Sequence, residues 1–189
     1  MRAPTVPAFR GRAHVLVEVR VQSLALDRTT NTPVVILQEV DGERVLPIWI
    51  GPGEASAIAM QLAEMEFSRP LTHDLLCSVL KSLGGAVRKV IITRVEKSTY
   101  YAELIVQRNG DLFSLDARPS DSIAVALRSD ARIYAEDDLL EVASIELADD
   151  EAVSELTEER LEPIDPDLSM DAEKLREHLR GLNPEDFGR

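Results

Sequence analysis

The sequence predicts an α+β protein made of two related βββα units, with a mostly antiparallel sheet, helices packed on it, and an acidic C-terminal tail that carries a short helix. Three observations predict this fold. A short sequence segment occurs twice, and a strand-like apolar run precedes each copy. Residues typical of hairpin turns join these runs to the strand-like runs before them. Because the runs do not alternate with helices, we expect antiparallel pairing rather than a doubly wound nucleotide fold.

The repeated phrase covers residues 51–60 and 118–127. Each copy has a proline at the expected start of a helix and an acid two residues later: Pro52 and Glu54, then Pro119 and Asp121. Both copies follow a strand-like run. The register predicts two half-domains whose helix N-termini occupy equivalent positions at the seam between them.

In the first half, apolar periodicity predicts three strands and then two helices. The strands are expected at residues 14–26, 32–40 and 45–50, with a hairpin turn at Asp41-Gly42. The helices are expected from Gly53 to about Glu66 and from Thr72 to Leu83, the second ending at Gly84-Gly85.

The second half repeats the plan. Strands are expected at residues 87–96, 100–107 and 111–117, with a turn at Asn109-Gly110, followed by a helix at 120–128. Residues 132–135 and 140–145 are expected to add short strands. The acidic residues 136–138 between them are interpreted as a solvated turn or the first turn of a helix.

Composition divides the chain into a flexible N-terminus (1–12), a folded domain (13–147) and an acidic tail (148–189). From Asp149 onward there are 14 acidic and 5 basic residues. Residues 169–182 predict a short amphipathic helix with a leucine stripe, which either docks on a core or partner or stays solvated. The tail is therefore a candidate binding site for a protein partner.

The overall charge and apolar content restrict the class of protein. The formal charge is −13, so any binding to nucleic acid must rely on local arginines or bound cations. No apolar run is long enough to span a membrane, and the N-terminus has no secretory signal. The single cysteine, Cys77, lies in an apolar helical pattern and is interpreted as a buried thiol. We therefore expect a cytoplasmic protein without membrane contact, and its sheet edges favour a homo-oligomer.

Two sequence motifs at strand-to-helix junctions contain candidate catalytic and ligand-binding residues. Residues 69–74 and 116–122 both contain Arg-Pro, then a hydroxyl residue, then an acid in the first helical turn. Helix N-termini and arginines attract phosphate, which makes candidate phosphate ligands of Arg69, Arg118, Thr72 and Ser120. A divalent cation, Mg²⁺ or Mn²⁺, would be bound by Glu54, Asp116 and Asp121, while His73 or Asp74 would orient or deprotonate water.

Ordinary capping explains the same residues without chemistry. Hydroxyl residues are common N-caps, and acids are favoured in a first turn by the helix dipole. Convergence of the candidates on one cleft distinguishes a site from separate caps, because capping requires no convergence.

These junction residues resemble the bifunctional nuclease domain family. The resemblance covers roughly residues 14–145 and rests on Leu46-Pro47-Ile48-Trp49-Ile50-Gly51 with Glu54, on residues 69–74 and on residues 116–124. The ending at residues 182–187 is similar to the tails of bacterial members. The resemblance implies a compact α+β fold that self-associates, and DNase and RNase activity.

Two functions follow as hypotheses. The first is a metal-dependent nuclease, a hydrolase of phosphodiester bonds in DNA or RNA. The second is a non-catalytic oligomeric binding or regulatory module, in which the helix starts are structural and the acidic tail recruits a partner.

Overall fold

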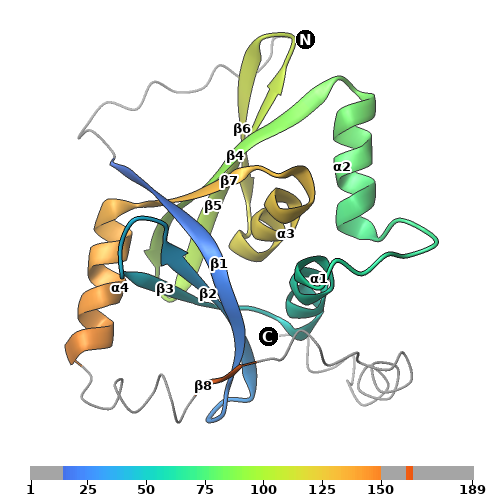
Figure 1. Ribbon diagram of the computed structural model, residues 1–189. Helices are drawn as coiled ribbons and strands as arrows, with labels where there is room; N and C mark the ends of the chain where they lie inside the picture. Colours follow the sequence, from blue (N-terminus) through green and yellow to red (C-terminus); the bar gives the residue numbers. More distant parts are fainter. Residues whose placement is uncertain (1–14, 150–160, 164–189) are drawn as a thin grey trace.

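The computed structural model describes residues 15–149 and 161–163 (Figure 1). The elements of the first half are β1 (Leu16–Asp27), β2 (Thr32–Glu39), β3 (Val45–Trp49), α1 (Pro52–Leu62) and α2 (Thr72–Ser82). The second half contains β4 (Gly85–Glu96), β5 (Thr99–Arg108), β6 (Asp111–Ala117) and α3 (Pro119–Ser129). After it come β7 (Arg132–Glu136), α4 (Asp137–Asp149) and β8 (Leu161–Pro163). None of the helices in these ranges has the length and hydropathy of a membrane-spanning segment.

The strands form a mostly antiparallel sheet in the order β3-β2-β1-β7-β4-β5-β6, with β8 paired to β1. The one parallel pair in this path joins β4 to β7. Each half is a three-stranded meander that leads into a helix, and β7 lies between the two meanders. The α+β class and the repeated βββα order predicted from the sequence are confirmed.

Turn chemistry explains one of these meanders directly. Asn109 and Gly110 both have positive φ values, 52° and 89°, between β5 and β6. Two consecutive residues of this kind make the tight turn whose twist matches paired strands, which is why Asn-Gly predicts a hairpin.

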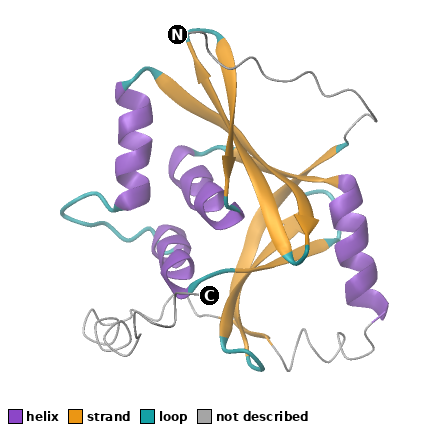
Figure 2. Ribbon diagram, turned by 180° about the vertical axis from the view of Figure 1, so that it is seen from behind, coloured by secondary structure: helices purple, strands orange, loops and turns teal. Residues whose placement is uncertain are grey.

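The helices cover different parts of the sheet. α1, α2 and α3 lie side by side, whereas α4 lies across the strands from them (Figures 1 and 2). α3 is the most enclosed, since residues 122–126 are all buried, and the core joins them to side chains such as Leu37, Ile58 and Val90. α2, by contrast, has no buried residue.

Two boundaries differ from the sequence prediction. Residues 140–145, predicted as a strand, lie in α4, because Leu139, Leu140 and Ala143 become buried at helical spacing. Asp137 and Asp138 of the acidic run lie in the first turn of this helix, where Arg44 forms an ion pair with Asp137 at 2.9 Å, and Glu136 ends β7. α1 ends at Leu62 rather than near Glu66. The predicted helix at 169–182 lies outside the described residues.

Leu140 is fully buried, so we expect Leu140→Ala to lower the free energy of unfolding by about 2–5 kcal/mol through lost contacts and a cavity. Urea denaturation measures the loss. Val142→Ala on the same helix is the control, because Val142 is 46% exposed and its truncation should cost under about 0.5 kcal/mol. Equal effects of the two changes would contradict the burial pattern of α4.

Candidate functional site

Three helices begin in the same way. The N-caps of α1, α2 and α3 are Gly51, Leu71 and Arg118, and an acid stands three residues after each: Glu54, Asp74 and Asp121. The predicted hydroxyl caps are therefore wrong in position, since Thr72 is the first residue of α2 and Ser120 the second of α3. Acids at this position are stabilised by the positive end of the helix dipole.

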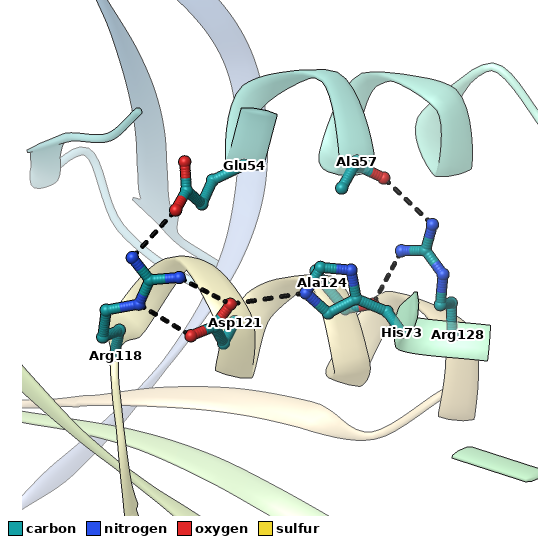
Figure 3. Close-up of polar contacts among 7 residues, drawn as sticks. All are labelled: Glu54, Ala57, His73, Arg118, Asp121, Ala124 and Arg128. Atoms are coloured by element: carbon teal, nitrogen blue, oxygen red, sulfur yellow. Dashed lines mark hydrogen bonds and ion pairs between the residues drawn. The ribbon is translucent and has the colours of Figure 1, made fainter. Parts of the chain in front are cut away.

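Arg118 joins the first turns of α1 and α3 (Figure 3). Its Nε lies 2.8 Å from Asp121 Oδ2 and its Nη2 3.2 Å from Asp121 Oδ1, while its Nη1 lies 2.8 Å from Glu54 Oε1. The two acids that matched in the sequence repeat thus bind opposite sides of one guanidinium. Gly51 leaves room for this arrangement, because a Cβ there would clash with the carboxylate of Glu54.

His73 brings the first turn of α2 to the same place. Its Nε2 lies 3.4 Å from Asp121 Oδ1, and its side chain is 15% exposed (Figure 3). Asp121 therefore contacts both a guanidinium and an imidazole. We call Glu54, His73, Arg118 and Asp121 the junction cluster.

Asp74 belongs to a neighbouring set of contacts. Its Oδ2 accepts a hydrogen bond from the backbone N–H of Leu71, and its Oδ1 accepts one from Arg128. Arg128 also donates to the carbonyl oxygens of Ala124, at 3.0 Å, and Ala57, at 3.1 Å. With a side chain only 5% exposed, Arg128 joins α3 to the first turn of α2 and to the middle of α1.

Arg128 was missed in the sequence, although a signal was present. Asp121, Ala124 and Arg128 follow the spacing i, i+3, i+7 and lie on one face of α3. Arg128 also follows the apolar run 123–126 by two residues, and a charged side chain that close to a core-forming run indicates a buried partner.

The contacts change the ionisation of Asp121. Burial alone would raise the pKa of Asp121, but hydrogen bonds from Arg118 and His73 outweigh burial and the pKa lies below its ordinary value. Hydrogen bonding to Asp121 in turn raises the pKa of Arg118. The pair is therefore charged at neutral pH. At Cys77, burial raises the pKa of the thiol, so this residue is not an activated nucleophile.

The structure brings together four of the sequence-predicted residues and separates the others. Arg69 is exposed in the loop before α2, and Thr72 is exposed at its start. Ser120 is buried. Asp116 is exposed on β6, paired in register with Glu103, and among the described residues takes no part in the junction cluster.

The predicted metal ligands do not form a donor set in this arrangement. Arg118 occupies the space between Glu54 and Asp121, and its positive charge takes the role that a cation would have. Within residues 15–149 and 161–163, no three His, Cys, Asp or Glu side chains are placed to hold a metal ion. The dependence on Mg²⁺ or Mn²⁺ stays a prediction.

The junction cluster has two chemical capabilities. A carboxylate that orients an imidazole is the arrangement used for general acid–base catalysis. A guanidinium that is 65% exposed can bind an oxyanion with two parallel hydrogen bonds. Both groups lie where three helices begin, and the partial positive charge of helix N-termini favours anions.

Comparison with known proteins gives two kinds of relative. A family model described as the bifunctional nuclease domain matches residues 35–148. An uncharacterized protein of Mycobacterium tuberculosis is 40% identical over 173 residues, which is 90% of this chain and 97% of the relative. Bifunctional nuclease 1 of Arabidopsis thaliana is 27% identical over 100 residues, and its counterpart in Oryza sativa subsp. japonica is 28% identical over 105.

The matched part covers only 31% and 32% of these two plant proteins, but 51% and 54% of this chain. The family model covers more than half of the chain and includes every member of the junction cluster. The chain belongs to the bifunctional nuclease domain family.

Proposed function

We propose that this protein is a nuclease that hydrolyses phosphodiester bonds in DNA or RNA at the junction cluster. The observation that carries the proposal is the chain of contacts from His73 through Asp121 and Arg118 to Glu54. Plant relatives in the same family are named bifunctional nucleases, which supports the choice of substrate.

His73 is the proposed general base. When Nε2 donates its hydrogen to Asp121, the lone pair on Nδ1 is available to take a proton from an attacking water. Asp121 then stabilises the imidazolium that forms. Asp74, the alternative base in the sequence prediction, is less suited, because Leu71 and Arg128 already bind its two oxygens.

Arg118 is the proposed phosphate ligand. A phosphate oxygen can replace Glu54 at Nη1 while Asp121 keeps its two hydrogen bonds and holds the guanidinium in place. This exchange brings the phosphate next to the carboxylate that orients His73. Binding and proton transfer therefore occur around the same residue, Asp121.

We expect His73→Ala to reduce hydrolysis of single-stranded and double-stranded DNA and RNA by about 10²- to 10⁴-fold, the usual contribution of a general base. Asp121→Asn should reduce it as well. Initial rates with fluorescent substrates, in the presence and absence of Mg²⁺ or Mn²⁺, measure the effect and the metal dependence together.

Asp111→Asn is the matched control, because Asp111 is exposed at the start of β6 and lies outside the junction cluster. Identical purification of all variants separates the protein's own activity from a contaminant. If the His73→Ala protein is as active as the wild type, the proposed catalytic role of the cluster is wrong.

A non-catalytic binding or regulatory module is the second candidate. It is favoured by the observation that each carboxylate of the junction cluster is already ion-paired with Arg118, as an interlock between helices requires. In that case the wild-type protein hydrolyses no nucleic acid under any metal condition, although the cluster still stabilises the fold.

The stabilising role of Asp121 has a defined pH dependence. Because its pKa is lower in the folded protein than the ordinary 3.8, the folded state binds fewer protons, and the stabilisation is present above that pH and lost as pH falls. We expect the wild type to lose stability from about pH 5 to about pH 3, and Asp121→Asn to lose less. Urea denaturation at both pH values measures the difference, and parallel losses in the two proteins would contradict it.

A further inference from the structure

Positive charges cross three adjacent strands on the face of the sheet that points away from the core. Val19, Ile133 and Val90 are buried, and they pair with one another across β1, β7 and β4. Because side chains alternate between the two faces of a strand, the residue next to each of them lies on the opposite face. On β1, β7 and β4 these neighbours are Arg20, Arg132 and Lys89.

Arg88 adds a fourth charge at a β-bulge. The pairing of β4 with β5 changes register between Val87 and Lys89, and Arg88 Nε donates to Gln107 Oε1 at 2.7 Å. Gln107 follows the buried Val106, so it lies on the same outward face. We call four residues the basic row: Arg20, Arg88, Lys89 and Arg132.

The basic row has few acidic partners. The chain contains 34 acidic residues against 21 lysines and arginines, so cations that gather without carboxylates are a marked local feature. Of the residues that the structure describes, Glu18 is the acid that forms an ion pair with the row, 3.4 Å from Arg132. The two side chains of this pair are 37% and 70% exposed, and such a pair contributes little free energy. The row therefore keeps a local excess of positive charge.

Two contacts order the row before any ligand binds. Lys89 Nζ lies 5.5 Å from the centre of the Tyr134 ring, which is a cation–π contact. Gln107 holds Arg88 from the neighbouring strand. A side chain that is already ordered loses less conformational entropy when it binds an anion.

We propose that the basic row binds the phosphate backbone of a nucleic acid, at a place separate from the junction cluster. Neighbouring strands lie about 4.8 Å apart, so the row extends over about 10 Å. A DNA strand presents one phosphate per about 3.4 Å of helix axis, and this length therefore matches about three phosphates. Gln38, which pairs with Arg20, and Gln107 border the row with amides, which also bind phosphate oxygens. The choice of ligand rests on the proposed function.

The row and the junction cluster lie at opposite ends of α3. This helix begins directly after Arg118 and ends at Ser129, shortly before Arg132 begins β7. Its 11 residues span about 16 Å. A strand bound at both places must therefore contain at least about five nucleotides. The row acts away from the bond that is cleaved, so its removal should raise KM for a long substrate and leave kcat unchanged.

The distribution of acids favours a strand over an anionic membrane. Glu103 and Asp116 pair with each other on the same face of the sheet, and Glu18 lies beside the row. A membrane presents a plane of negative charge to all of these carboxylates, which repel it. A nucleic-acid strand is narrow enough to follow the row alone.

Fluorescence anisotropy of a labelled 20-nucleotide DNA strand, titrated with the full chain in EDTA at several salt concentrations, tests the proposal. Four phosphate contacts predict a slope of log K against log salt of about −2.8. The double variant Arg20→Gln, Arg132→Gln should reduce the slope to about −1.4 and weaken binding about tenfold at low salt. Gel electrophoresis confirms that the strand stays intact.

The matched control is the double variant Lys81→Gln, Lys97→Gln. It removes the same charge at exposed positions on α2 and in the turn between β4 and β5, and it should bind like the wild type. Circular dichroism confirms that both variants are folded.

The outcomes separate this inference from the proposed nuclease activity. Row-dependent binding by a protein that hydrolyses no nucleic acid supports the basic row and contradicts the nuclease. Hydrolysis of the 20-nucleotide strand with the same KM in wild type and row variant contradicts the basic row alone. Equal weakening by the two double variants overturns the proposal, as does a wild type that binds phosphatidylserine vesicles but not the strand.

Discussion

The burial of α3 is the constraint on which the rest of the domain depends. Residues 122–126 are enclosed, so their helix can carry charge only at its ends. Arg118 occupies one end and Arg128 the other. Arg118 binds the first turn of α1, and Arg128 binds the first turn of α2 and a carbonyl of α1. The central apolar helix thus positions its neighbours through two arginines rather than through apolar packing alone.

The two arginines have different roles because their side chains differ in solvent exposure. Arg128 is almost fully enclosed and donates to Asp74 and two carbonyl oxygens, so removing it would break the polar contacts that join α3 to α1 and α2. Arg118 is largely exposed, and its ion pair with Glu54 can be exchanged for another anion at little cost. The structural role and the proposed functional role are therefore separated along one helix, and the proposed functional role falls at the N-terminus.

Much of the fold could be predicted from the sequence, because apolar periodicity and turn residues are local signals. Asn109-Gly110 and the prolines that begin α1 and α3 specify backbone geometry by themselves. The error at residues 140–145 has the opposite cause, since a short apolar run fits a strand or a buried helix equally well. The acidic residues at its start, and the ion pair with Arg44, which is distant in sequence, favour the helix. The candidate site was predictable in part: residue types identified Glu54, His73, Arg118 and Asp121, but not that Arg118 would stand between the acids.

The two halves of the repeat do not form equivalent sites, because their N-caps differ, Gly51 before α1 and Arg118 before α3, and because α2 delivers a histidine to one side alone. Glu54 and Asp121 hold the same position in α1 and α3, and both bind Arg118. α2 occurs only in the first half, and it delivers His73 to Asp121 and not to Glu54. In the proposed mechanism, the histidine makes Asp121 the partner for proton transfer and leaves Glu54 as an exchangeable ion-pair partner. The N-cap arginine of α3 and the inserted helix α2 together give the junction two chemically different sides.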